Sequence, residues 1–272
     1  MPLSRNQIKK LGHRLRDTIP PSDEDLALYL EMCSSLYQGL LDTSVEIAQN
    51  LGLSVVTRFK TSRTLIEKLQ RSPNITLGYI NDVAGMRIVV DGGRIEQDEI
   101  VSQLVDNLRA VGGTTRIMDR REEPSFGYRA VHVIVKLDGV LVEIQVRTEF
   151  QDLWANVMEK FADVFGRQVR YGDEPDNPDA PLHSDFDMTP RMAYERILEF
   201  AENVSSLERL AVAYESLPEP FVFSDDLDYG DLSEEEVEYL RGQDLGDVIK
   251  EGEEAVEKTL NGMMKAFESL GV

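Results

Sequence analysis

Two carboxylates and three basic side chains in the first part of the sequence are of the types that handle a polyphosphate. Asp82 and Glu143 offer hard oxygen ligands of the kind that Mg²⁺ takes beside substrate phosphates. Arg58, Lys60 and Lys68 supply the fixed positive charge that a triphosphate needs. Because these residues come from separate segments, a shared site requires a fold that brings the segments together.

An alternating segment, Tyr128–Thr148, predicts the strands that carry Glu143. Apolar and polar residues alternate on both sides of Asp138-Gly139, a pair that favours a type I′ hairpin turn. A two-residue loop fixes the register, so His132 faces Gln145, and the valines form a core face. The opposite face is either a ligand site, with an aromatic ring for a base, or an ordinary solvated strand surface; its residues are Tyr128, His132, Glu143, Gln145 and Arg147.

Other periodicities predict the elements that hold this hairpin. They are helices beginning at Ser4 and Ser22, the second reaching about Leu51; strands at Met86–Val90 and Thr115–Met118; and helices at Gln97–Ala110, Phe150–Phe165 and Arg191–Leu217. In the helix after the hairpin, Trp154, Val157, Phe161 and Val164 are expected in the core. Asp173–Pro190 reads as a linker, and Ser233–Leu270 as one or two acidic, amphipathic helices.

The negative charge of the 272-residue chain is concentrated in its last part. The net charge is −21. Up to Gly172 there are 22 Lys and Arg against 23 Asp and Glu, a net of −1; from Asp173 onward there are 7 against 27, a net of −20. The first part can therefore bind phosphates, whereas the acidic part repels nucleic acid and is a candidate docking surface for a partner or a neighbouring protomer.

Composition excludes several classes of protein. No apolar run approaches the roughly 18 residues that a membrane helix needs. Met1–Leu11 contains no apolar core or cleavage site of a secretion signal. Cys33 is the single cysteine, which excludes an intrachain disulfide and a cysteine-based zinc site. A soluble, cytoplasmic protein is expected.

Four motifs, in this order, resemble the synthetase domain of RelA/SpoT-type alarmone synthetases. They are Arg58-Phe59-Lys60 with Thr64 and Lys68, Asp82-Val83-Ala84-Gly85-Met86-Arg87-Ile88, Gly127-Tyr128-Arg129-Ala130-Val131-His132, and Glu143-Ile144-Gln145-Val146-Arg147-Thr148. The resemblance covers about Val55–Gly172 and the size fits a small alarmone synthetase. It implies an α/β (α+β) fold with a mixed β-sheet flanked by helices, similar to nucleotidyltransferases. The synthetase domain would span 55–172, between N-terminal helices at 1–54 and an acidic helical extension at 173–272.

The resemblance also implies an activity and roles for the matching residues. The reaction transfers the β,γ-pyrophosphate of ATP to the ribose 3′-hydroxyl of GDP or GTP, making guanosine penta- or tetraphosphate, (p)ppGpp. ATP would be held by Arg58, Lys60, Thr64, Lys68 and Arg87; Mg²⁺ by Asp82 and Glu143; and the acceptor nucleotide by Tyr128, His132, Gln145 and Arg147. Asp82, Glu143, Arg58 and Lys60 would be catalytic, with Glu143 drawing the proton from the attacking hydroxyl. The hairpin register independently places three of the acceptor residues on the face of Glu143.

Two departures from the family pattern bear on the substrate. Typical guanosine-acceptor enzymes have a Lys-Asp pair and a Pro-Lys-x-Asn stretch before the Gly-Tyr, but Asp119–Phe126 is shorter and lacks that lysine and asparagine. The family's hydrolase domain needs a His-Asp pair, whereas the three histidines here precede Arg14, Val133 and Ser184, so synthesis without hydrolysis is expected.

The acceptor therefore has two candidate identities. The first is GDP or GTP. The alternative is a toxin-type synthetase that pyrophosphorylates the 3′-terminal adenosine of tRNA or an adenosine nucleotide and is neutralised by an antitoxin. An arginine cluster suits the larger polyanion and consists of Arg116, Arg120, Arg121 and Arg129. The acidic tail argues against tRNA, because nucleic-acid binding needs cations at the contact. A non-catalytic nucleotide-binding module is disfavoured, since both carboxylates are present, and homo-oligomers are common among small synthetases.

Overall fold

The computed structural model describes residues 3–182, 188–224, 227 and 232–270. These residues form two compact units, which we describe separately. The first unit contains the chain up to Val90, Gln97–Asp119 and Ala130–Arg147; the second contains Asp91–Glu96, Arg120–Arg129 and the chain from Thr148 onward. The division of the sequence at 54/55 and 172/173 stays a prediction.

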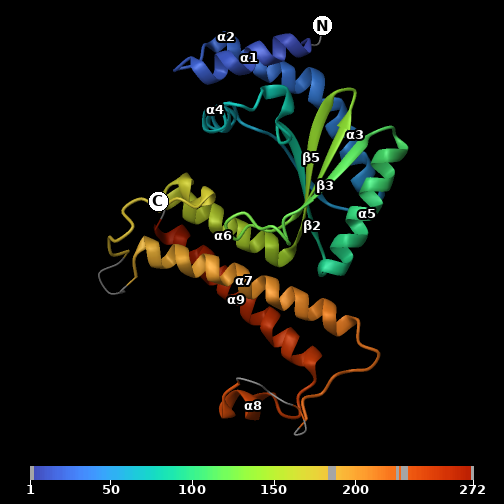
Figure 1. Ribbon diagram of the computed structural model, residues 1–272, viewed down its shortest axis with the longest axis vertical. Coiled ribbons are helices and arrows are strands. Elements are labelled where there is room, and N and C mark those ends of the chain that lie inside the picture. The colour runs from blue at the N-terminus through green and yellow to red at the C-terminus, as the bar shows by residue number, and fades with distance from the viewer. Residues whose placement is uncertain (1–2, 183–187, 225–226, 228–231, 271–272) are drawn as a thin grey trace. The chain divides into compact units, whose positions relative to one another are not determined.

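A mixed five-stranded sheet in the order β1-β2-β5-β4-β3 forms the centre of the first unit (Figure 1). The strands are β1 (Val55–Phe59), β2 (Ala84–Val90), β3 (Thr114–Asp119), β4 (Val131–Leu137) and β5 (Val140–Thr148). β1 pairs with β2, β3 with β4 and β4 with β5, each antiparallel. The sheet and its flanking helices confirm the predicted α/β (α+β) class.

The β4–β5 hairpin has the register predicted from its turn. His132 pairs with Gln145, and Ile134 with Glu143. Asp138 and Gly139 have φ values of 51° and 85°, the left-handed conformation that a type I′ turn needs at both positions. Since side chains alternate between faces, the buried Val133 and Ile144 lie on the core face, opposite Glu143.

The helices of the first unit cover this core. They are α1 (Arg5–Asp17), α2 (Asp23–Met32), a π-helical segment (Cys33–Tyr37), α3 (Gln38–Asn50), α4 (Ser62–Arg71), a 3-10 turn (Leu77–Tyr79) and α5 (Arg94–Ala110), whose first turn belongs to the second unit. Ser4 and Ser22 cap α1 and α2 through the backbone N–H groups of Gln7 and Asp25, as predicted. Apolar residues of α3 and α5 pack with the core face of the sheet. The predicted long helix is thus one helical run from Asp23 to Asn50, interrupted by the π-helical segment.

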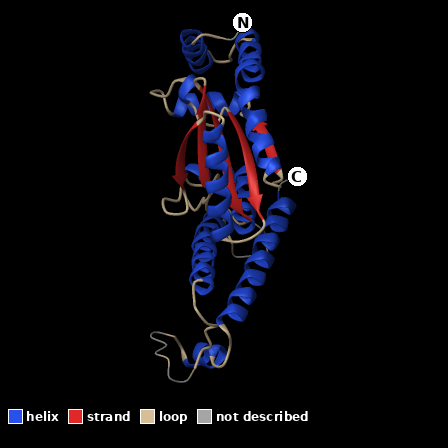
Figure 2. Ribbon diagram, turned by 90° about the vertical axis from the view of Figure 1, so that its right-hand side faces the viewer, coloured by secondary structure: helices blue, strands red, loops and turns tan. Residues whose placement is uncertain are grey.

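Three helices form the core of the second unit (Figures 1 and 2): α6 (Glu149–Phe165), α7 (Pro190–Glu215) and α9 (Leu245–Leu270). Trp154, Phe161 and Leu260 are buried among them, and Phe161 meets the ring of Phe267 edge-on at 5.3 Å. Val164 is only half-buried. The apolar stripe of α9 therefore packs within this chain, which removes it as a reason to expect a docking partner. The short α8 (Glu234–Leu240) buries no residue.

A buried polar network joins segments of the second unit that are far apart in sequence. Glu208 of α7 accepts hydrogen bonds from Arg94, Thr148 and Gln151. Arg94 also donates to Ser205, and its side chain and that of Glu208 are 8% and 4% exposed. This network fixes the beginnings of α5 and α6 against α7.

No helix among the described residues is long and apolar enough to span a membrane.

Candidate active site

Asp82 lies between two lysines that come from different elements. Lys60 follows β1, and its Nζ lies 2.8 Å from Asp82 Oδ2; Lys68 is on α4, and its Nζ lies 2.7 Å from Asp82 Oδ1. The Lys60 backbone is fixed on both sides, because its N–H donates to the carbonyl of Val83 and its carbonyl accepts from the hydroxyl of Tyr29. The Lys60 side chain is therefore held beside Asp82, with 16% of its surface exposed, and its role in binding ATP stays a prediction.

The charge of Asp82 is stabilised by these lysines. Burial alone would raise the pKa of the carboxyl group, but the charges and hydrogen bonds of Lys60 and Lys68 outweigh it and lower the pKa to about 2. Asp82 is ionised at neutral pH, and two cations already neutralise it. Sequence reasoning assigned these lysines to ATP and did not foresee that they hold Asp82.

Glu143 sits at the centre of a second chain of polar side chains, on the sheet face opposite the valine core face. His132 Nδ1 lies 3.3 Å from Glu143 Oε1, Gln145 Nε2 donates to Glu143 Oε2 at 2.9 Å, and Arg147 donates to Gln145 Oε1 at 3.2 Å. The structure thus brings together the four residues that the hairpin register places on one face.

The pKa of Glu143 is set by opposing effects. Burial and the negative charge of Asp82 raise the pKa of Glu143. The hydrogen bond and charge of His132 lower that pKa by more, so the net pKa is below the ordinary value. Asp82 is therefore close enough to Glu143 to affect its pKa.

The residues predicted to hold ATP lie on β1, α4 and β2. Arg58 is exposed and pairs with Gly85, and Arg87 pairs with Val56, so both arginines lie on the sheet face that carries Glu143. Thr64 occupies the first turn of α4, where its hydroxyl donates to the carbonyl of Thr61. Its predicted contact with ATP would compete with that hydrogen bond.

Gly85 is a site residue that the motif contained but that had no predicted role. A Cβ atom at this position would lie 2.9 Å from the backbone oxygen of Glu143. Glycine suits this position because β2 and β5 approach closely here. The close approach also brings the start of β2, which follows Asp82, beside Glu143. The available signal is a glycine just before the predicted strand Met86–Val90, in a segment that the structure includes in β2.

Tyr128 belongs to the second unit, where the segment before it forms a tight loop. Ser125 and Tyr128 exchange backbone hydrogen bonds, and a Cβ at Gly127, whose φ is 81°, would lie 2.7 Å from the Trp154 ring. Tyr128 packs against the helical core of this unit. Its role in stacking on the acceptor base stays a prediction.

Arg129 has a structural position in this loop. It is 5% exposed, and its guanidinium donates to the carbonyls of Gly127 and Ala201 and to the Glu202 carboxylate. This finding corrects the predicted polyanion-binding cluster: Arg129 is committed to α7, which leaves Arg116, Arg120 and Arg121.

The carboxylates of Asp82 and Glu143 could hold Mg²⁺ together with substrate phosphates. Among the described residues, no group of three or more His, Cys, Asp or Glu side chains is placed to hold a metal. Asp82 and Glu143 are two nearby hard oxygen donors, and Mg²⁺ commonly takes one or two carboxylates together with substrate phosphates. A magnesium–nucleotide complex therefore suits this site better than a metal held by protein alone.

Comparison with known proteins identifies the region that carries these residues. Residues 57–162 match the model of a region found in RelA/SpoT proteins. We refer to this stretch as the RelA/SpoT-like region. It contains every residue that the sequence motifs predicted for ATP, Mg²⁺ and the acceptor.

Similar proteins are found among curated proteins and among solved structures. An uncharacterized protein of Mycobacterium tuberculosis is 36% identical over 181 residues, which cover 64% of this chain and 64% of that protein. The small alarmone synthetase 2 of Bacillus subtilis is 21% identical, covering 71% of this chain and 96% of that one, with a TM-score of 0.46. The small alarmone synthetase 1 of the same organism, bound to its product pppGpp, is 20% identical, covering 71% and 95%, with a TM-score of 0.41.

Proposed function

We propose that the RelA/SpoT-like region, residues 57–162, is an ATP-dependent pyrophosphokinase that transfers the β,γ-pyrophosphate of ATP to the ribose 3′-hydroxyl of GDP or GTP, making (p)ppGpp. The observation that carries the proposal is the ionised Asp82 between Lys60 and Lys68, close enough to Glu143 for its negative charge to raise the pKa of that carboxyl group. Fixed cations beside paired carboxylates are the requirement of phosphoryl-group transfer.

Each of these residues has a role in the proposed transfer. Lys60 and Lys68 turn from Asp82 to the phosphates of ATP, joined by Arg58 and Arg87. Asp82 and Glu143 would hold Mg²⁺, which when bound neutralises charge that develops on the transferred group. The acceptor 3′-oxygen attacks the β-phosphorus, the bond from that phosphorus to the oxygen bridging to the α-phosphate breaks, and AMP leaves. Glu143 accepts the proton of the attacking hydroxyl, and His132 and Gln145 hold its carboxylate in place.

A second acceptor is supported by the loop before Tyr128. Asp119–Phe126 lacks the lysine and asparagine typical of guanosine-acceptor enzymes, and it carries Arg120 and Arg121. These features favour the alternative acceptors, the 3′-terminal CCA adenosine of tRNA or an adenosine nucleotide, with an antitoxin to restrain the activity. The net charge of −20 beyond Gly172 favours the smaller guanine nucleotide.

The proposal places the protein among synthetases that act without a hydrolase. The only described His residues, His13 and His132, precede Arg14 and Val133, and His183 lies outside the described residues. We propose a cytoplasmic enzyme of the stringent response, because its nucleotide substrates and its alarmone product belong there.

The test follows labelled phosphate from ATP to its acceptor. Purified protein with Mg²⁺ and γ-labelled ATP is offered GDP, GTP, AMP, ADP or bulk tRNA in parallel, with the Glu143→Gln variant as the matched control. We expect label on a guanine nucleotide and none with the variant. Label on tRNA alone would establish the alternative, and no transfer to any acceptor would refute both. Incubation with labelled (p)ppGpp checks for hydrolysis, which we expect to be absent.

A further inference from the structure

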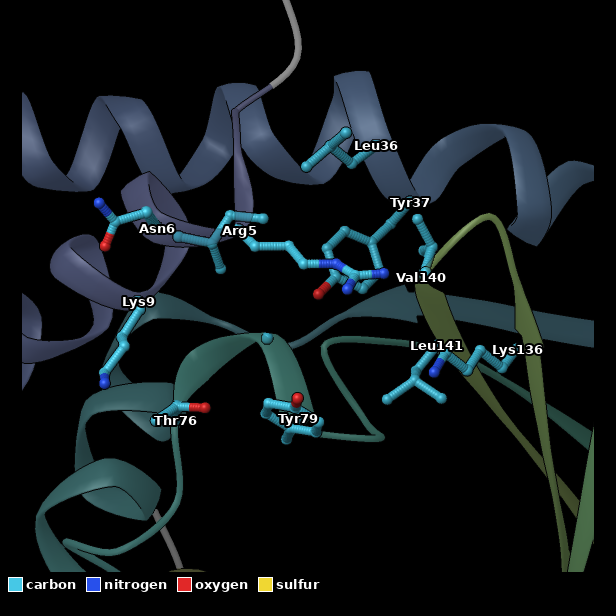
Figure 3. A pocket seen from close by; sticks show the side chains of 13 residues that line it. Arg5, Asn6, Lys9, Leu36, Tyr37, Thr76, Tyr79, Lys136, Val140 and Leu141 are labelled. Atoms are coloured by element: carbon cyan, nitrogen blue, oxygen red, sulfur yellow. The ribbon is translucent and has the colours of Figure 1, made fainter.

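A cavity of about 410 Å³ lies in the first unit, away from the residues assigned to the reaction (Figure 3). Its walls come from α1, the π-helical segment, the 3-10 turn at Leu77–Tyr79 and the β4–β5 turn. None of the residues proposed for ATP, Mg²⁺ or the acceptor lines it. It is therefore a separate candidate site.

The cavity is positively charged, with no acidic residue in its lining. Arg5, Lys9 and Lys136 line it, although the chain as a whole has a net charge of −21. Arg5 extends from α1 to the hairpin turn, where a Cβ at Gly139 would lie 3.4 Å from its Nη2. Within the part of the chain that the structure describes, none of these three side chains makes an ion pair or a hydrogen bond. Three cations that share one cavity without a protein counter-ion favour an anionic ligand.

Tyr37 supplies a hydroxyl that also lacks a protein partner among the described residues. The residue is 4% exposed and lines the cavity, and its hydroxyl makes no hydrogen bond within the described residues. Figure 3 shows that hydroxyl directed into the cavity. Burial raises the pKa of Tyr37 to about 12, so the group remains a hydrogen-bond donor. The hydroxyl oxygen is not among the buried polar atoms without a partner, so it is open to the cavity, where a ligand can accept its hydrogen bond.

The remaining walls suit an aromatic group. Tyr79 lies at the rim with 77% of its surface exposed, and Ile8, Leu36 and Leu141 provide apolar contact. Cavities that bind small molecules measure about 300–1,000 Å³ and combine an apolar lining with a few placed polar groups. The cavity thus has separate surfaces for a polyanion and for a planar ring.

We propose that this cavity is a second nucleotide site that binds a nucleoside triphosphate. The triphosphate contacts Arg5, Lys9 and Lys136, and the base stacks on Tyr79 and accepts a hydrogen bond from Tyr37. The proposal does not depend on the reaction proposed above, because it concerns other residues and a binding equilibrium.

Hydrogen–deuterium exchange of the full chain with ATP and with GTP locates the binding. We expect slower exchange in residues 5–9, 76–80 and 136–141. The Lys9→Ala/Lys136→Ala double variant, whose changes are at exposed positions, should abolish that protection and weaken binding there at least about tenfold. Lys10→Ala is the matched control, since Lys10 is an exposed neighbour that does not line the cavity. Absence of protection with both nucleotides, or protection that survives in the double variant, would overturn the proposal.

A second experiment separates the contribution of the base to binding from that of the phosphates. Inorganic tripolyphosphate carries the charge without a ring, so we expect it to protect the same segments more weakly than a nucleotide. Tyr79→Ala should weaken nucleotide binding and leave tripolyphosphate binding unchanged. Equal binding of tripolyphosphate and nucleotide to the unaltered protein would show a site for phosphate alone and contradict the nucleotide assignment.

Discussion

At the scale of single residues, the proposed role of Glu143 as a general base fits its neighbours, because His132 and Gln145 lower its pKa. Replacing it with Gln keeps the shape and removes the proton acceptor. We expect Glu143→Gln to lower kcat at least about 100-fold, the usual lower limit for a general base, with an unchanged circular-dichroism spectrum. Gln145→Ala is a useful comparison, because it removes one hydrogen bond to Glu143 and leaves the carboxylate; its effect on kcat should be smaller. Equal losses in the two variants would argue against proton transfer to Glu143.

Asp82 links the same site to the pH dependence of stability. Its pKa falls from an ordinary value of 3.8 to about 2 on folding, so its contribution is fully present above pH 4 and is lost as the pH falls towards 2. The shift corresponds to about 2 kcal/mol at neutral pH, of which about half is gone near pH 3. The contribution of Asp82 to the unfolding free energy is measured by urea unfolding of the parent protein and of the Asp82→Asn variant between pH 7 and pH 3. The difference in unfolding free energy should shrink below pH 4; a constant difference would contradict the ion-pair explanation.

At the scale of elements, the approach of β2 to β5 is the contact that brings the two carboxylates together. Gly85→Ala places a methyl group against the backbone of β5, and we expect a loss of about 1–3 kcal/mol in unfolding free energy together with reduced transfer activity. Gly39→Ala is the matched control. It lies in α3 with open space at its Cβ position, so it should be neutral or stabilising. A Gly85→Ala protein as stable as the control would show that the strands adjust freely.

The buried network around Glu208 predicts an effect of the same kind in the second unit. Glu208→Ala leaves the Arg94 guanidinium buried without its carboxylate, which costs about 3–5 kcal/mol. Glu195→Ala, at an exposed position on α7, should change the unfolding free energy by less than about 0.5 kcal/mol. Thermal unfolding gives the Tm of each variant, and we expect a lower Tm for Glu208→Ala. Similar Tm values would exclude a stabilising role for the network.

The hairpin and the site motifs could be predicted because local rules determine them. The Asp138-Gly139 turn sets the β4–β5 register, and that register alone places His132 and Gln145 beside Glu143. The pairing of Lys60 and Lys68 with Asp82 could not be predicted, because it depends on how α4 meets β2. The commitment of Arg129 to Glu202 likewise depends on α7, which lies some seventy residues later in the sequence. Long-range packing, which leaves no local pattern, accounts for both.

At the scale of the whole molecule, the acidic C-terminal part supplies core residues and cannot be removed as an appendage. α7 and α9 bury Trp154 and Phe161 of α6, and Leu260 of α9 is fully buried. We expect truncation after Tyr171 to expose that apolar surface, to raise the binding of a hydrophobic dye and to cause aggregation. A truncated protein that stays monodisperse with weak dye binding would show that α6 is stable without these helices.

The two lysines on Asp82 also bear on how fast a nucleotide can enter. In the free protein they act as built-in counter-ions, so the site presents little bare negative charge to an approaching polyphosphate. Entry is then an exchange of partners, in which the ammonium groups pass from a carboxylate to the phosphates of the magnesium–nucleotide complex. Such an exchange releases few ions to the solvent. The association rate of ATP should accordingly vary only weakly with salt concentration.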